Sequence, residues 1–192
     1  MSTRILGQGR WLALHEINYL DPNGKTRDWE CVRRIGGRGA AAIVATAEKN
    51  GEAHLVVVKQ FRPPVGAYVL ELPAGLIDEH ENAAETAIRE LAEETGFRGK
   101  PLDIGPFVHN SPGLTDETTA LVRIAVTEEG CNAPDGDEAI EVLLFPIRGL
   151  KARLLEENAR TGVHLDAKLW CFALGLETAG ILKTSGGGAA SG

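Results

Sequence analysis

Residues 75–97 read GLIDEHENAAETAIRELAEETGF and carry a dense cluster of acidic side chains. Glu90 and Glu94 stand four residues apart with Glu93 between them, and side chains at these spacings share one face of a helix. Three carboxylates on one face repel one another, and Arg89 can relieve only part of that repulsion. A hard cation such as Mg²⁺, which takes oxygen ligands, would relieve the rest. The stretch therefore predicts a divalent-metal site, and the alternative is a solvated acidic face on a surface helix.

The same stretch predicts a helix over residues 81–95. Gly96 follows this helix and suits a left-handed C-cap. Small and aliphatic side chains recur at helical spacing, which indicates a buried stripe. The stripe consists of Ala84, Ala87, Ile88, Leu91 and Thr95. With this stripe turned toward the core, we expect the three glutamates to border it and to face an open edge where metal and substrate could enter.

The composition favours one core and excludes several classes of partner. The chain has 192 residues, 43% of them apolar, which is enough for one domain with an added element. Its net charge is −7 and no Lys/Arg run exceeds a pair, which argues against a nucleic acid partner. No apolar run approaches the roughly 18 residues that a membrane span needs, so we expect no membrane partner.

Cysteine usage indicates a reducing compartment. Cys31, Cys131 and Cys171 are widely spaced and form no CxxC pair, so neither a disulfide framework nor a zinc site is expected. The amino terminus has no apolar signal-peptide core. We expect a cytoplasmic protein, with the nucleus as a further location and organelle import left open.

Turn-forming residues indicate two hairpins before the acidic stretch. Residues 11–20 and 25–34 flank DPNG, and residues 40–47 and 54–62 flank EKNGE. After the acidic stretch we expect strands over residues 102–109, 118–127 and 140–145, and helices over residues 148–161 and 166–182. Mixed strands with a few helices predict an α/β fold, a mixed β-sheet sandwiched between helices, with an N-terminal antiparallel hairpin extension.

The acidic stretch resembles the Nudix hydrolase box. Its specified positions are Gly75, Glu81, Arg89, Glu90, Leu91, Glu93, Glu94, Gly96 and Phe97. The segments VVVKQFRPPVGAYVLELPAGLID and SPGLTDE resemble the ADP-ribose pyrophosphatase (ADP-sugar diphosphatase) branch of that family. GRWLALHEINYLDPNGKTRDWECVRR and DGDEAIEV are similar to the eukaryotic members. One departure is Ser111, because the most similar relatives have aspartate before the Pro-Gly pair.

The resemblance also divides the chain into three parts. Residues 1–39 would form an N-terminal β extension that makes dimer and base-binding contacts, and residues 40–183 a Nudix hydrolase domain with the Nudix fold. Residues 184–192 are too rich in Gly and Ser to pack, and we expect a disordered tail there.

The resemblance implies a role for each acid of the box. The backbone carbonyl of Ala74, together with Glu90 and Glu94, would bind Mg²⁺, with Mn²⁺ as an alternative. Glu93 would join when further cations bind, and Arg89 would hold the glutamates in place. The catalytic set implied in this way is Glu138, Glu93, Glu94 and Arg89. Glu138 matches the position of the base that deprotonates the attacking water, and Asp116 and Glu117 remain alternatives for that base.

The resemblance implies a substrate site as well. Arg62 would meet the diphosphate, because a guanidinium has five fixed donors that match phosphate oxygens. Trp11 and Trp29 would sandwich the adenine, with Arg34 in the base pocket; otherwise these tryptophans would be core or dimer contacts. In the family each sandwich is built from two subunits, so a homodimer is expected. Leu76 and Pro112 complete the expected substrate-binding set.

The implied activity is Mg²⁺-dependent hydrolysis of ADP-ribose, or of a related ADP-sugar, to AMP and a sugar phosphate such as ribose 5-phosphate. One alternative keeps the chemistry and changes the substrate to another nucleotide sugar or to an oxidised nucleoside diphosphate. Another alternative is a module that binds ADP-ribose without cleaving it. The intact acids of the box and Arg89 disfavour this sensor.

Overall fold

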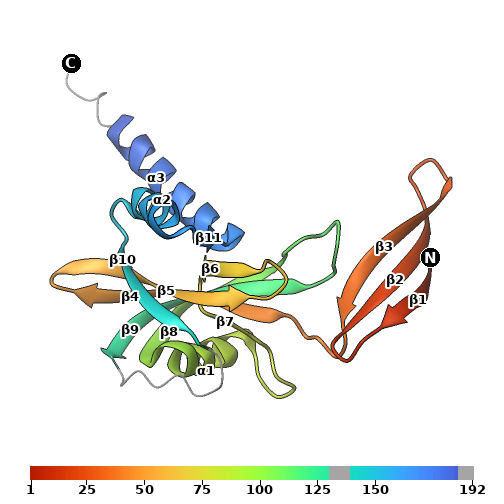
Figure 1. Cartoon of the computed structure of the whole chain (residues 1–192), viewed down its shortest axis with the longest axis horizontal. Helices are drawn as coiled ribbons and strands as arrows, with labels where there is room; N and C mark the ends of the chain where they lie inside the picture. The colour runs from red at the N-terminus through yellow and green to blue at the C-terminus, as the bar shows by residue number, and fades with distance from the viewer. Residues whose placement is uncertain (130–138, 186–192) are drawn as a thin grey trace.

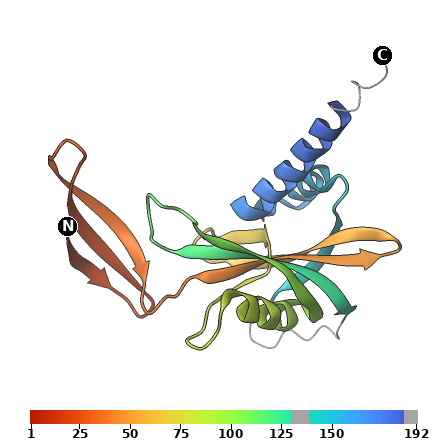
Figure 2. The same ribbon diagram turned by 180° about the vertical axis from the view of Figure 1, so that it is seen from behind.

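The chain folds into two β-sheets and three helices (Figure 1). The computed structural model describes residues 1–129 and 139–185. The smaller sheet has the order β1-β2-β3 and is antiparallel, and we call it the N-terminal sheet. Its strands are β1 Ser2–Gln8, β2 Leu12–Leu20 and β3 Thr26–Arg34. In Figures 1 and 2 this sheet stands beside the rest of the molecule rather than within it.

The larger sheet is mixed. Its main path runs β11-β6-β5-β4-β9-β8, while β10 pairs with β5 and β7 pairs with β4. The pairs β4–β9 and β6–β11 are parallel, and the other pairs are antiparallel. The strands are β4 Ala40–Lys49, β5 Glu52–Arg62, β6 Ala67–Glu71, β7 Ala74–Leu76, β8 Phe97–His109, β9 Thr118–Glu129, β10 Glu141–Pro146 and β11 His164–Leu165.

The helices lie on opposite faces of this sheet. The helix α1 Ala83–Thr95 packs on one face, and α2 Leu150–Thr161 and α3 Ala167–Ser185 pack on the other (Figure 2). Successive strand residues point to opposite faces, so Val56 joins the core under α1 while Leu55 joins the core under α2 and α3. The predicted mixed sheet between helices, with an antiparallel N-terminal hairpin, is confirmed.

Short turn and capping motifs in the sequence adopt the conformations that we predicted, apart from the start of α1. Asn50 and Gly51 both have positive φ, at 55° and 78°, which is the conformation that a tight hairpin turn needs. Asn82 caps α1 by accepting bonds from the backbone of Ala84 and Glu85, so the helix begins two residues later than predicted. Gly96 ends α1 in the left-handed conformation, as predicted.

The predicted buried stripe of α1 is wrong at one position. Ile88 is 42% exposed, and Ala84 is only partly buried. The buried side instead includes Thr86, whose hydroxyl donates to Glu81, and Thr95, whose hydroxyl donates to the carbonyl of Leu91. Because these hydroxyls are hydrogen-bonded, burying the threonines costs little free energy. The buried face of α1 is therefore rotated relative to the predicted stripe, so that it includes Thr86 and leaves Ile88 exposed.

Other differences from the predicted elements are small. The strands β1, β6, β7 and β11 were not predicted, and β8 begins at Phe97 instead of at residue 102. The helix α3 continues to Ser185, so two residues that we assigned to the tail are helical. No helix in residues 1–129 and 139–185 is long and apolar enough to cross a membrane.

Candidate active site

Arg89 lies at the centre of the acidic cluster. Its Nε and Nη2 donate to the two carboxylate oxygens of Glu81 at 2.8 and 2.9 Å. Its Nη1 donates to Glu90 at 2.7 Å and to Glu93 at 2.9 Å. A weaker bond of 3.4 Å runs from Nη2 to the carbonyl oxygen of Leu76. One guanidinium therefore joins three carboxylates and the start of the box, which is an arrangement that orients acids and leaves little of Arg89 for a substrate.

The acids of the cluster differ in their ionisation. Hydrogen bonds from Arg89 and then Thr86 lower the pKa of Glu81 to about 2, so Glu81 is a fixed anion. Burial raises the pKa of Glu90 above its usual value, although Arg89 acts in the opposite direction. The hydrogen bonds to Glu81 raise the pKa of Arg89 still further. Glu90 is therefore a partly buried carboxyl for which burial outweighs the hydrogen bond from Arg89.

Glu90 and Glu94 both reach the backbone of β7. The amide of Ala74 donates to Glu94 Oε2 at 3.1 Å. A Cβ at residue 75 would overlap the carboxylate of Glu90, so only glycine leaves room for it. The strand β7 is in turn held by β4, where Ala42 pairs with Ala74. Two carboxylates thus meet two consecutive residues of one strand.

These donors suit a hard cation. The set would be carboxylate oxygens from Glu90 and Glu94 and the carbonyl oxygen of Ala74, and Mg²⁺ is commonly held by one or two carboxylates together with water and phosphate. In the described residues, no three His, Cys, Asp or Glu side chains converge closely enough to hold a metal as they stand. Water and bound phosphate oxygens would complete the coordination.

Arg62 lies on the same face of the sheet as α1. Val56 packs under α1, and Arg62 follows six residues later on the same strand, so alternation places both on one face. The guanidinium of Arg62 forms two hydrogen bonds with Glu71, at 2.7 and 2.8 Å. Glu71 is a partner that we did not predict, because no local motif links residues nine apart on two different strands.

The two tryptophans lie at separate places on the N-terminal sheet. Trp29 is in the middle of β3, and its Nε1 donates to the carbonyl of Gly113 at 3.0 Å. Trp11 precedes β2, is 63% exposed, and has the guanidinium of Arg10 at 4.5 Å from its ring. In the part of the chain that the structure describes, no ring contact joins the two indoles. Arg34 is five residues beyond Trp29, about 17 Å along an extended strand.

The loop between β8 and β9 carries the remaining predicted residues. Pro112 lies in this loop, which runs along β3, since the amide of Val32 donates to the carbonyl of Leu114 at 2.9 Å. Asp116 and Glu117 form ion pairs with Arg33 and Arg34 at 3.0 and 2.9 Å. Both of these alternative bases are therefore engaged with arginines.

Two predicted site residues remain. Leu76 ends β7 with an exposed side chain, and its carbonyl oxygen is the one that Arg89 reaches. Glu138 lies outside the described residues. Sequence reasoning gave no role to Glu81, although it is a specified position of the box and is the strongest partner of Arg89.

Comparison with known proteins identifies the family. The model of the NUDIX domain matches residues 37–165, which include α1 and the strands β4 to β11 in the larger sheet. The chain belongs to the Nudix family. The Nudix match excludes β1, β2 and β3, so the N-terminal sheet is an addition to the family domain.

Several relatives of this Nudix protein have names that concern ADP compounds. The ADP-sugar pyrophosphatase of Mus musculus is 34% identical over 189 residues, covering 93% of this chain and 87% of the relative. The ADP-ribose pyrophosphatase of Saccharomyces cerevisiae is 41% identical over 179 residues, covering 87% of this chain and 77% of the relative. A crystal structure of an ADP compounds hydrolase shares the fold, with a TM-score of 0.64 and 20% identity over 97% of this chain and 94% of that one.

Proposed function

We propose that this Nudix protein hydrolyses the diphosphate of ADP-ribose and related ADP-sugars, giving AMP and, from ADP-ribose, ribose 5-phosphate. The observation that carries the proposal is the complete acidic cluster around Arg89, with Glu90 and Glu94 meeting β7. The identity of 34% and 41% to relatives named for ADP-sugar and ADP-ribose supports the substrate class. A module that only binds ADP-ribose would not need this cluster to be complete.

We propose Mg²⁺ as the cofactor, with Mn²⁺ as an alternative. Glu90, Glu94 and the carbonyl of Ala74 would hold the first cation, and Glu93 would join for further ones. When bound, the cations would neutralise the diphosphate oxygens and make water a better nucleophile. The raised pKa of Glu90 is consistent with this role, because a buried carboxylate gains most from an added positive charge.

The side chains of the protein would bind and orient the substrate. Arg62 would donate hydrogen bonds to oxygens of the diphosphate on the α1 face of the sheet. Glu71 fixes the direction of its guanidinium there. Arg89 would hold Glu90 and Glu93 and would not touch the substrate. Glu138 would accept the proton of the attacking water, and a well-placed general base contributes on the order of 10²- to 10⁴-fold.

We also propose a homodimer in which each adenine lies between Trp11 of one subunit and Trp29 of the other. The arrangement of one chain supports this, since the carbonyl of Trp11 accepts a hydrogen bond from the amide of Ile35, just past the end of β3, whereas Trp29 lies six residues earlier in the chain. Six strand steps span roughly 20 Å, far more than the thickness of one base. A single chain would therefore not close both indoles on one adenine.

The surface of the N-terminal sheet supports the dimer as well. A three-stranded sheet needs an apolar face covered by other groups to be stable. Here all residues of β1 are exposed, and so are several large apolar side chains of the sheet. They include Leu12, Leu14 and Leu20, which alternate along β2 and therefore share one face. A second copy of the chain would cover them.

For localisation we propose the cytoplasm, with the nucleus as an alternative. Cys31 and Cys171 are both free thiols, which fits a reducing compartment.

The proposed function is tested with a substrate panel. Purified protein is incubated with Mg²⁺ and ADP-ribose, other ADP-sugars, other nucleotide sugars or oxidised nucleoside diphosphates, and the products are identified by chromatography. We expect AMP and ribose 5-phosphate from ADP-ribose at the highest kcat/KM. Higher kcat/KM for a substrate without adenine would overturn the assignment of substrate.

Two variants then test the assigned roles. Glu94→Gln should lose turnover even at saturating Mg²⁺, and near-normal turnover would remove Glu94 from the metal site. Glu138→Gln should retain substrate binding and lose turnover. An unchanged rate for Glu138→Gln would transfer the role of base to another acid.

A further inference from the structure

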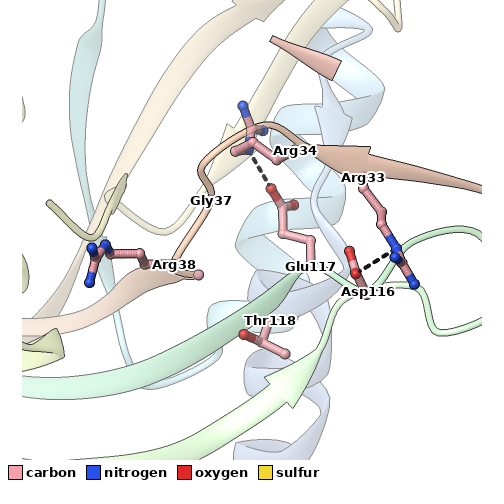
Figure 3. A pocket seen from close by; sticks show the side chains of 8 residues that line it. Arg33, Arg34, Gly37, Arg38, Asp116, Glu117 and Thr118 are labelled. Carbon is pink, nitrogen blue, oxygen red and sulfur yellow. Dashed lines mark hydrogen bonds and ion pairs between the residues drawn. The ribbon is translucent and has the colours of Figure 1, made fainter. Parts of the chain in front are cut away.

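A pocket of about 330 Å³ lies between the end of β3 and the start of β9 (Figure 3). Its charged lining consists of Arg33, Arg34, Arg38, Asp116 and Glu117. The pocket borders the Nudix box, because the carbonyl of Gly39 in its wall accepts a hydrogen bond of 3.1 Å from the amide of Ile77. It also borders the loop that holds Trp29 through the carbonyl of Gly113. The pocket therefore lies beside both the loop bonded to Trp29 and the start of the Nudix box.

Arg34 lines this pocket with only part of its guanidinium engaged. Its Nε donates to Glu117 Oε1 at 2.9 Å, and Figure 3 shows the two side chains facing each other. Within residues 1–129 and 139–180, the Nη groups of Arg34 form no other hydrogen bond with the protein. A guanidinium presents five donors in a rigid fork, so fixing Nε also fixes the direction of both Nη groups.

Glu117 is itself anchored to the larger sheet. Its second carboxylate oxygen accepts from Asn110 Nδ2 at 3.2 Å, and its backbone carbonyl accepts from the amide of Asn110 at 3.2 Å. The Oδ1 of Asn110 accepts from the hydroxyl of Thr119 at 2.9 Å. Thr119 is 2% exposed and lies on β9, where it pairs with Ala40 of β4. A relay of three side chains thus connects Arg34 to a buried strand.

The neighbouring ion pair lacks such support. Asp116 lies 3.0 Å from Arg33 Nε, but its carboxylate is more than half exposed and has no second partner in the described residues. A pair whose carboxylate is exposed and has no further bond contributes little and does not fix the direction of that carboxylate. Of the two carboxylates that pair with the arginines at the end of β3, only Glu117 accepts a second side-chain hydrogen bond within the described residues.

We propose that Glu117 is a positioning residue for the substrate site. Through Asn110 and Thr119 it holds Arg34 so that the Nη groups meet hydrogen-bond acceptors on the adenosine half of the substrate. This inference rests on the proposed function, and it assigns Glu117 to binding instead of to proton transfer.

The test is a double-mutant cycle measured on ADP-ribose with Mg²⁺. Glu117→Gln keeps the size of the side chain and removes the charge, and we expect KM to rise about tenfold, because the single remaining oxygen is neutral and cannot accept from both Arg34 and Asn110. The value of kcat should stay within about twofold of wild type, since bound substrate still meets the acidic cluster. In an Arg34→Ala background, Glu117→Gln should have no further effect, because Glu117 acts only through Arg34.

Two other variants guard against a merely structural effect. Asn110→Ala breaks the relay one step further away and should raise KM in the same direction by a smaller factor, again only when Arg34 is present. Glu157→Gln removes a glutamate that pairs with Arg160 on α2, away from the pocket, and should change neither constant. Unfolding midpoints of all variants show whether each variant is folded under the assay conditions.

The outcomes separate this inference from the proposed function. If wild-type protein cleaves ADP-ribose and Glu117→Gln has unchanged constants, or effects that add to those of Arg34→Ala, the positioning role is wrong. A loss of kcat at unchanged KM would make Glu117 the base. If wild-type protein does not cleave ADP-ribose, the proposed function fails first and this inference fails with it.

Discussion

Replacing Leu91 and Ile88 by alanine tests the orientation of α1, which sets the direction of the acids. Leu91 is 0% exposed and packs in the core under the helix, whereas Ile88 is 42% exposed. A buried Leu→Ala change costs about 2–5 kcal/mol, and we take about 3 kcal/mol here. For a chain of this size each 1 kcal/mol shifts the unfolding midpoint by about 2–4 °C, so Leu91→Ala should lower it by roughly 6–12 °C.

Ile88→Ala should have a much smaller effect. An exposed aliphatic side chain loses little burial, and alanine has the higher helix propensity, so the change should stay within about 1 kcal/mol. Both variants are measured by circular dichroism during heating, without added metal. Equal losses for the two variants would refute the observed rotation of α1, and the approach of Glu90 and Glu94 to β7 would be refuted with it.

Three further predictions concern the site. The pKa of Glu81 is about 2 in the folded protein and 4.5 in the unfolded chain. Its ionised form therefore stabilises the fold at pH values above 4.5, and this contribution is lost as the pH falls through about 2. Glu81→Gln should therefore lower the unfolding midpoint at pH 7, and the gap to wild type should close between pH 4.5 and 2; a constant gap would contradict this. Gly75→Ala should leave the protein folded but displace the carboxylate of Glu90, which should reduce kcat/KM about tenfold or more at limiting Mg²⁺, as a Mg²⁺ titration would show; wild-type kcat/KM would count against it. Trp11→Ala and Trp29→Ala should each raise KM for ADP-ribose far more than KM for a diphosphate that lacks a base. At low substrate each variant should have little activity. When the two variants are dissociated and mixed, the mixture should regain about a quarter of wild-type activity, since half of randomly paired dimers hold one intact sandwich, and no recovery would refute the shared site.

Local sequence signals predicted the elements whose causes are local. The turn at Asn50 and Gly51 and the C-cap at Gly96 depend on backbone conformations that few residues adopt, so they could be read directly. The strand β1 gave no such signal, because every one of its residues is exposed and no alternation of apolar and polar residues develops. Ile88 was misplaced because helical periodicity does not show that a buried threonine has found a hydrogen-bond partner.

The candidate site was predictable where one motif contains it. Glu90, Glu93, Glu94 and Arg89 stand within six residues, and the helix that carries them fixes their spacing. The bond from Arg62 to Glu71 joins different strands, and the relay from Arg34 to Thr119 joins residues that are far apart in the sequence. Such pairs depend on how the sheets are assembled, which periodicity does not report.

Binding of Mn²⁺ tests the central claim that Glu90 and Glu94 hold a divalent cation. The signal of free Mn²⁺ in electron paramagnetic resonance is followed while protein is added, with wild type, Glu94→Gln and the α2 control Glu157→Gln. We expect wild type and the control to remove the signal equally, and Glu94→Gln to bind Mn²⁺ about tenfold more weakly or worse. Equal binding by all three proteins would contradict the metal site.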